Sequence, residues 1–563
     1  MSERISVFLS RALYIALLLL FLIAFALSIN AFFNPDIHFM QLSMSYKWLA
    51  LIILLLFLAG LFFVVKKTNE GEELELRETS RTNTAANQVL RKKINYKDIV
   101  FIFLIALCVR LAFLLFYGQF VYPISDFEMV HMAAMGFGRP QNYELWSHWA
   151  IYSIILQVLY ILTVPHYITA QVLNAIVTSG TAVIIYLLAY NMSDKRNIAL
   201  AAAAIFALYP TNIVYNTILT NEHLAVLFTC IFLLLLTIKK KSWIQLYIFS
   251  AIAGIFAAFE DSLKGIILIA VIAYVITLIL AIMRSRKYLP IRESEEKKTS
   301  AETSSEIPRR SSLKLLSMIA ISIAVLISTF LLSSFAIGRT AERILDIEFV
   351  DTSKLMANVL YIGLQPSGEG QVHLGDNPRM FLVLLEENNR DFELARDKTY
   401  DFLLEQIREN PGQFARLFPQ KFRWAWQDDT VPAYFLWLTT SRQAPSAAIN
   451  AEHISPRLLY ISEQILPTVS QIFYMSLVAF TIIGLLFAFL ELKERFNFGL
   501  LLISLHCFGF FLLLLISEAQ SRYKVMIIPL LCILAAYGVK NTGGRIFEKS
   551  NAICCHRKGA DST

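Results

Sequence analysis

Two carboxylates stand two residues apart in a short stretch that follows an apolar segment. They are Asp126 and Glu128, in the run Tyr-Pro-Ile-Ser-Asp-Phe-Glu at 122–128. If this stretch is a loop, both side chains can point into one cleft, where one acts as a general base and the other positions a substrate or a cation. A solvent-exposed acidic loop explains the same pattern without any chemistry.

Two more charged positions fall inside or at the edge of apolar segments. Arg110 lies within the apolar stretch 98–117, where a guanidinium needs a carboxylate or a lipid phosphate, or must reach out to the headgroups. Glu222 and His223 open the apolar stretch 222–238. Glu222 is either a functional carboxylate or a residue that stabilises a helix N-terminus, and a single His beside a helix start is commonly structural.

Cationic residues also occur in two short turns between apolar stretches. Lys264 follows 243–259, and Arg522 and Tyr523 lie where the last apolar stretch begins. Arg and Lys at a membrane surface suit the phosphate of a lipid, which Arg can bind with two hydrogen bonds. These three residues are therefore candidates for a phosphate site.

The elements that must position these residues are membrane helices. Of the 563 residues, 56% are hydrophobic and 17% are charged, and many apolar stretches reach the length of about 20 residues that crosses a bilayer. The composition excludes an ordinary soluble protein, and the six cysteines show no metal-site spacing. We predict an all-α polytopic membrane protein with about twelve spans: 9–33, 46–65, 98–117, 168–190, 198–216, 222–238, 243–259, 263–283, 313–336, 467–490, 497–516 and 523–540.

A thirteenth apolar stretch, 148–163, decides the topology. It has about 16 residues and is rich in Trp and Tyr, including Tyr152, which favours a helix that lies in the membrane interface. If it does not cross, the basic loops all fall on one side, as the positive-inside rule requires. We therefore expect a multi-pass protein of the cell membrane with both termini in the cytoplasm, and the net charge of +7 indicates topology rather than nucleic-acid binding.

The spans divide the chain into six parts. The predicted parts are two N-terminal helices (1–66), a cytoplasmic linker (67–97), a membrane core (98–336) with an outer acidic loop (118–147), an extracytoplasmic domain (337–466), the C-terminal transmembrane helices (467–540) and a cytoplasmic tail (541–563). Residues 337–466 mix apolar and polar residues at helical spacing, so a small α-rich or α/β domain is expected there. One of its helices should cover 390–408 and stop at Asn410–Pro411.

The order of these features resembles the GT-C superfamily of glycosyltransferases that use polyprenyl-phosphate sugars. The nearest branch is the one of bacterial protein mannosyltransferase-like and aminoarabinose transferase-like enzymes (glycosyltransferase family 39-type). The resemblance covers about 98–540. It rests on these features in order: Arg110, Ser125-Asp126-Phe127, Tyr152, Asn174, Tyr209-Pro210, Tyr215, Glu222, Leu263-Lys264-Gly265, 363–370, Asn410-Pro411, Lys421, Trp424 and Arg522-Tyr523. The chain departs from the family pattern at 129–131 and 148–153, so the donor sugar is not identified.

The resemblance implies an inverting transfer of a hexose or pentose from a polyprenyl phosphate to an extracytoplasmic glycan, lipid or protein. Asp126 is then the general base, and Glu128, Glu222, His223 and Tyr152 position the acceptor or the sugar. Arg110, Lys264, Arg522 and Tyr523 bind the leaving phosphate. No metal or cofactor is required, although a divalent cation held by Asp126, Glu128 and Glu222 is an alternative.

Two other classes of function use a similar architecture. A transporter or flippase of lipid-linked sugars usually carries charged or broken helices at mid-membrane and inverted repeats, and neither is evident here. A polymerase or ligase of surface polysaccharide would act on similar substrates.

Overall fold

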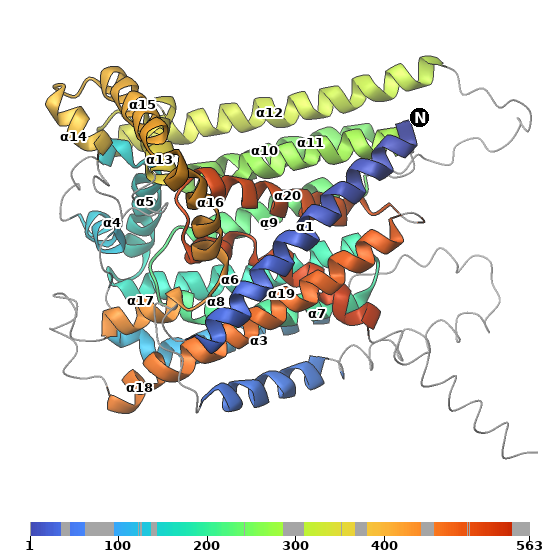
Figure 1. Cartoon of the computed structure of the whole chain (residues 1–563), viewed down its shortest axis with the longest axis horizontal. Helices are drawn as coiled ribbons and strands as arrows, with labels where there is room; N and C mark the ends of the chain where they lie inside the picture. Colours follow the sequence, from blue (N-terminus) through green and yellow to red (C-terminus); the bar gives the residue numbers. More distant parts are fainter. Residues whose placement is uncertain are drawn as a thin grey trace, which may run out of the picture.

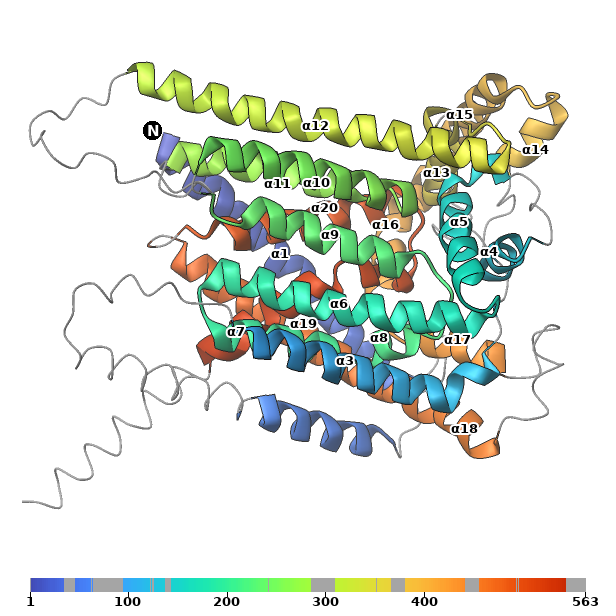
Figure 2. The same ribbon diagram turned by 180° about the vertical axis from the view of Figure 1, so that it is seen from behind.

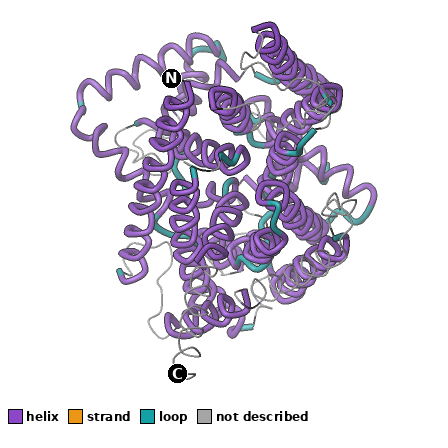
Figure 3. The backbone as a smooth tube through the Cα atoms, turned by 90° about the vertical axis from the view of Figure 1, so that its right-hand side faces the viewer, coloured by secondary structure: helices purple, strands orange, loops and turns teal. Residues whose placement is uncertain are grey.

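The computed structural model describes most of the chain, and it is built from helices. The described residues are 2–34, 46–61, 63, 95–121, 123, 126–136, 143–240, 242–284, 309–350, 352–365, 380–440, 455–492, 494 and 496–542. No strand occurs among them (Figure 3). Most of the linker 67–97, the tail from 543 onward and parts of the 118–147 and 363–370 segments lie outside the described residues.

Among the described residues, eight helices are long and apolar enough to cross a membrane. They include α1 (Ser2–Phe33), α3 (Tyr96–Tyr117), α6 (Tyr167–Ser193), α10 (Trp243–Leu263), α11 (Ile267–Arg284), α12 (Arg309–Leu345), α19 (Leu466–Glu491) and α20 (Phe498–Ile516). They run side by side in one bundle (Figure 1). This architecture fits an all-α polytopic membrane protein.

The other four predicted spans contain shorter helices. They are 46–61, α7 (Arg196–Ala207) with α8 (Pro210–Tyr215), α9 (Glu222–Thr237), and Ile528–Thr542. Pro210 at the first position of α8 separates it from α7, because proline cannot continue the hydrogen-bond pattern of the preceding helix. Length and composition alone thus support eight spans rather than twelve.

The bundle has two chemically different ends. At one, which we call the basic end, Arg196 pairs with Asp98 at 2.7 Å, and Lys239 pairs with Asp194 at 3.5 Å. Lys240 and Arg284 also lie at the ends of helices there. The chain begins near this end (Figure 1), where the Ser6 hydroxyl donates to the Leu280 carbonyl at 2.8 Å.

The opposite end is covered by helices that do not follow the bundle direction. We call it the α5 end, after α5 (Ser147–Leu162), which runs across the bundle instead of along it (Figure 2). Helix α4 (Asp126–Ala134) packs on α5. A crosswise helix of 16 residues is the arrangement that an interfacial 148–163 segment requires.

Residues 337–466 form further helices at the α5 end. They are α13 (Thr352–Leu364), α14 (Met380–Glu387), α15 (Phe392–Glu409), α16 (Pro411–Trp426), α17 (Val431–Thr440), α18 (Pro456–Tyr460) and a π turn (Ile461–Ile465). Asp391 caps α15, accepting at 3.0 Å from the amides of Glu393 and Leu394, and the helix ends at Asn410 close to the predicted stop. The described part of this region is purely helical.

The helices at both borders of this region run past the predicted boundaries. Helix α12 continues through 337 to Leu345, and its 37 residues span about 55 Å, more than the hydrocarbon thickness. At the other border, helical structure is continuous from Pro456 through Glu491. Moreover, residues 426–433 are buried within the bundle rather than in a separate outer domain.

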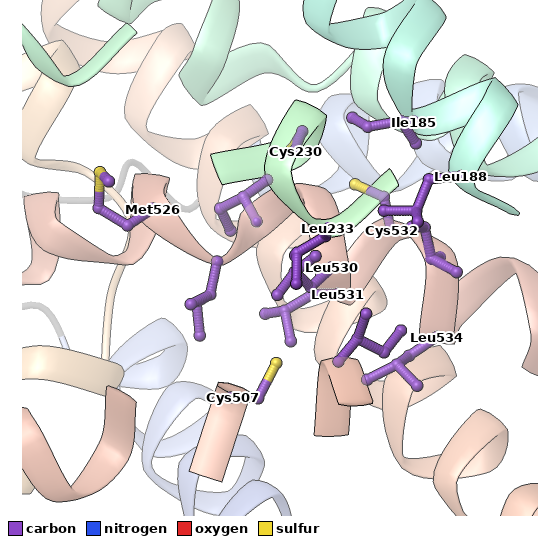
Figure 4. Packing of buried hydrophobic residues seen from close by; sticks show 14 of the residues in the cluster. Ile185, Leu188, Cys230, Leu233, Cys507, Met526, Leu530, Leu531, Cys532 and Leu534 are labelled. Carbon is purple, nitrogen blue, oxygen red and sulfur yellow. The ribbon is translucent and has the colours of Figure 1, made fainter. Parts of the chain in front are cut away.

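The core of the bundle is built around the last helix, Ile528–Thr542. Side chains from α6, α9 and α20 surround its residues Leu530, Leu531, Cys532 and Leu534 (Figure 4). Where this helix crosses α19, Gly484 and Gly538 face each other, and a Cβ at either would overlap backbone atoms of the other helix. Small residues allow the close approach that stabilises helix pairs in membranes.

Candidate functional site

An ion pair between the buried Glu222 and the partly exposed Lys264 lies at the α5 end. Glu222 opens α9, and Lys264 caps the end of α10, so the two meet where adjacent helices terminate. The Lys264 Nζ lies 2.6 Å from the Glu222 Oε1. The other oxygen, Oε2, accepts hydrogen bonds from the hydroxyls of Tyr215 and Thr220. Both carboxylate oxygens are therefore bound by the protein itself, and Glu222 serves to hold Lys264.

Arg522 and Tyr523 stand on a short 3₁₀ turn, Ser521–Met526, beside this pair. The Lys264 ammonium lies 4.7 Å from the centre of the Tyr523 ring, and the Tyr523 hydroxyl donates to the Glu518 Oε2 at 2.6 Å. The Arg522 guanidinium faces the rings of Phe127, Phe435 and Tyr523, at 6.0, 6.0 and 5.2 Å.

Arg522 has few hydrogen bonds within the protein. Its Nη2 reaches the Tyr523 hydroxyl only at 3.4 Å, and its Nε is buried without a partner among the described residues. Buried polar groups without partners are uncommon and call for an explanation. A guanidinium held by aromatic faces, with donors to spare, can bind an anionic oxygen.

Helix α5 contributes Tyr152 and His148 to the same site. The two lie four residues apart and so share one face of the helix. Tyr152 is buried, and its hydroxyl has no partner in the described part of the chain. Burial, together with the positive charge of Lys264, lowers the pKa of His148 to about 3, while Glu222 acts in the opposite direction. His148 is thus a neutral ring at neutral pH, close to the ion pair.

The acidic pair lies in a helix rather than in a loop, which corrects the expected geometry. Asp126 and Glu128 are in the first turn of α4. Residues two apart on a helix point about 200° away from each other, so these carboxylates do not share one cleft. Phe127 between them packs on Phe435 at 5.8 Å and faces Arg522, which brings the start of α4 to the site. Asp126 and Glu128 are both partly exposed.

Two predicted site residues are engaged elsewhere in the bundle. Arg110 is fully buried, and four protein acceptors take its hydrogens: the Thr178 hydroxyl at 2.8 Å and the carbonyls of Ala106, Ala207 and Phe206 at 3.0, 2.9 and 3.5 Å. His223 is also buried, with its Nε2 3.1 Å from the Tyr215 carbonyl oxygen. The surroundings of both are those of structural residues.

The structure does not form the joint cation site considered for Asp126, Glu128 and Glu222. In the described ranges, no group of three or more His, Cys, Asp or Glu side chains is arranged to hold a metal ion. The Glu222 oxygens are already bound by Lys264, Tyr215 and Thr220, which explains why this carboxylate does not contribute.

Sequence reasoning missed a second polar cluster on the far side of the 3₁₀ turn. Lys524 is fully buried, donates to the Asp428 carbonyl and lies 3.7 Å from the Asp429 Oδ1. The Asp429 Oδ2 accepts from the hydroxyls of Tyr209 and Thr211, both at 2.5 Å. Burial raises the pKa of Asp429, and Lys524 opposes that shift.

The site as a whole brings two cationic side chains together at one end of the bundle. Two cationic side chains, Arg522 and Lys264, are held by a carboxylate and aromatic rings, and the free hydroxyl of Tyr152 lies close by. Such a site can hold a phosphate and stabilise charge that develops on it. No protein-family model matches this chain, and no curated protein matches it.

Proposed function

We propose that the protein is an inverting glycosyltransferase that moves a sugar from a polyprenyl-phosphate donor to an extracytoplasmic acceptor. The observation that carries the proposal is Arg522, a guanidinium with unused donors that stands beside Lys264 where the bundle ends. Lipid phosphates lie at this depth of a membrane, and Arg and Lys are the side chains that bind them.

The proposal includes a membrane topology. Twelve spans, made of the eight long helices and the four shorter ones, place the basic end in the cytoplasm together with both termini. The α5 end then faces outward. This topology is supported by the distribution of basic residues, because the basic end contains Arg196, Lys239, Lys240 and Arg284.

In the proposed reaction, the acceptor hydroxyl attacks the anomeric carbon of the sugar. Asp126 removes the proton of that hydroxyl as the new C–O bond forms. The bond between the anomeric carbon and the phosphate oxygen breaks, and the phosphate leaves with the electron pair. Arg522 and Lys264 stabilise the negative charge that accumulates on it, and Tyr152 donates its hydroxyl to the donor.

The test measures sugar transfer by purified protein from a panel of labelled polyprenyl-phosphate sugars. Asp126→Asn keeps the size of the side chain but removes the base, and we expect transfer to fall at least about 100-fold. Asp194→Asn is the control, because it removes an exposed carboxylate at the opposite, basic end of the bundle. Transfer by this control should equal that of the wild type.

Full activity of Asp126→Asn, with equal amounts of protein in the membrane, would overturn the assignment of the base. If the wild type instead moves intact lipid-linked sugars between the two leaflets of a vesicle and transfers none, the protein is a flippase rather than a transferase.

A further inference from the structure

Helix α16 is bonded to the end of α20, where the segment that carries Arg522 (518–523) begins. Lys421 of α16 is fully buried, and its Nζ donates to the carbonyls of Leu515 and Ser517 at 2.7 and 2.6 Å. These carbonyls belong to the last turn of α20, just before the segment 518–523. A third hydrogen bond, at 2.6 Å, goes to the carbonyl of Gly363 in α13. The three donors of one ammonium group are thus all used.

The contact of α13 with the same turn is unusually close. A Cβ at Gly363 would overlap the carbonyl oxygen of Ile516, so no other residue fits without moving the backbone. Lys421 and Gly363 therefore fix the same three residues, 515–517, from two different helices.

Residues 426–429, at the end of α16 and just after it, contact the other end of segment 518–523 through Lys524. Lys524 donates to the Asp428 carbonyl and faces Asp429. The Asp429 amide in turn donates to the Gln471 side chain at 3.0 Å, and the Tyr474 hydroxyl donates to the Trp426 carbonyl at 2.8 Å. Residues 426–429 are anchored to α19 in this way, so they provide a fixed support for Lys524.

Between these two attachment points, residues 518–523 present Glu518, Arg522 and Tyr523 to the site. Two hydrogen bonds of Glu518 stay within this segment: Gln520 and Tyr523 donate to it at 2.5 and 2.6 Å. Arg522 lies 3.4 Å from the Tyr523 hydroxyl and faces three aromatic rings. The attachments of the segment at its two ends therefore help to fix the place of Arg522.

We propose that Lys421 is a positioning residue for Arg522: it holds residues 515–517 so that the Arg522 guanidinium stands ready to bind a phosphate. The assignment of the phosphate rests on the proposed function, whereas the positioning of Arg522 by Lys421 does not. Site geometry must be held within about 0.5 Å to be productive, and the support of neighbouring residues provides this precision.

The first test measures the binding of polyprenyl phosphate to purified full-length protein. Lys421→Met removes the ammonium group but keeps the apolar chain, and we expect affinity to weaken about tenfold. The control is Lys398→Met on the surface of α15, where the lysine reaches only Asn388, and its affinity should equal that of the wild type. In an Arg522→Gln background, Lys421→Met should cause no further loss, because the effect passes through Arg522.

A second measurement does not depend on the ligand. The rate at which phenylglyoxal modifies Arg522, followed by mass spectrometry of its peptide, should rise at least about threefold in Lys421→Met, because a released segment opens more often. Gly363→Ala should raise the rate as well, although it leaves Lys421 in place, and it serves as the test if Lys421→Met does not fold. Lys398→Met should leave the rate unchanged.

The outcomes separate the two proposals. Wild-type affinity in Lys421→Met, or an equal further loss in the Arg522→Gln background, would overturn the positioning role. If the wild type does not bind polyprenyl phosphate at all, the proposed function fails, and the modification rate alone decides the role of Lys421. An unchanged rate in both Lys421→Met and Gly363→Ala would then refute it.

Discussion

Two arginines that look alike in the sequence have opposite surroundings in the structure. Arg110 lies inside the bundle, where the Thr178 hydroxyl and three carbonyls accept its hydrogens. Arg522 lies at the α5 end, where aromatic rings surround it and its Nε has no partner in the described residues. Both are expected from the sequence to bind the phosphate of a lipid donor, but the protein uses most of the Arg110 donors, whereas Arg522 makes one long hydrogen bond among the described residues.

The comparison shows that the hydrogen-bond acceptors around a cation, rather than its depth in the bundle, determine whether it has donors left for a ligand. A guanidinium that is bonded mainly to the protein stabilises the fold, because its hydrogen bonds link α3 to α6 and α7. A guanidinium held mainly by aromatic faces is kept in place without using its donors. This difference predicts distinct effects for the two substitutions to glutamine.

The largest effect on sugar transfer is expected for Arg522→Gln. The substitution removes the charge that stabilises the leaving phosphate, and kcat/KM should fall about 100-fold or more. Its midpoint of thermal unfolding in detergent should change little, because Arg522 makes one long hydrogen bond. Loss of transfer that is accompanied by an equal loss of folded protein would contradict this prediction.

Arg110→Gln should show the reverse pattern. The hydrogen bonds that link α3 to the Thr178 hydroxyl and the Ala207 carbonyl are lost, so the free energy of unfolding should fall by about 2–4 kcal/mol. The molecules that remain folded should transfer sugar at a rate near that of the wild type. Denaturant unfolding in mild detergent, together with activity per folded molecule, measures both quantities. A stable but inactive Arg110→Gln protein would place Arg110 at the donor after all.

A smaller effect is expected for Tyr152→Phe. The Tyr152 hydroxyl is buried and free, so its removal leaves no protein group unsatisfied. If the hydroxyl donates to the donor lipid, KM should rise about threefold to tenfold, in line with one hydrogen bond. If KM is unchanged, the hydroxyl does not contact the donor. The control is Tyr160→Phe, about two turns further along α5, where the hydroxyl is 2.8 Å from the His131 Nδ1. The KM of this control should equal that of the wild type.

The smallest effect concerns pH and stability. Burial and Lys264 hold the pKa of His148 at about 3, below its ordinary value of 6.5. Its contribution to stability is therefore complete above pH 6.5 and is lost as the pH falls from 6.5 toward 3. The drop in melting temperature between pH 7 and pH 4.5 should be smaller in His148→Gln than in the wild type. Equal drops would show that His148 is not held neutral by this site.

The sequence predicted the helices well because hydropathy and length act locally. Each of the eight long helices overlaps a predicted span, although α1 and α12 extend well beyond theirs. The charge distribution also predicts Glu222, Lys264 and Arg522 at one end of the bundle, where the structure has them. The shorter helices, such as α9 with 16 residues, lie below the length that identifies a span without ambiguity. Asp126 and Glu128 were assigned to a loop, because a nine-residue helix has little periodic signal.

What the sequence could not provide is the set of contacts between distant segments. Nothing near Arg110 indicates that Thr178 and Ala207 accept its hydrogens, since those residues lie on α6 and α7. Asp428 and Asp429 read as part of an outer domain, yet packing buries them against Lys524. Partners that are about 70 to 100 residues apart in sequence are set by tertiary structure and leave no local pattern.

The most direct test of the phosphate site is a structure of the full-length protein with bound polyprenyl phosphate. The phosphate should lie within hydrogen-bond distance of Arg522 and Lys264, with the Arg110 contacts to Thr178 and Ala207 unchanged. A phosphate bound at Arg110, or at the basic end beside Arg196, would contradict the central claim.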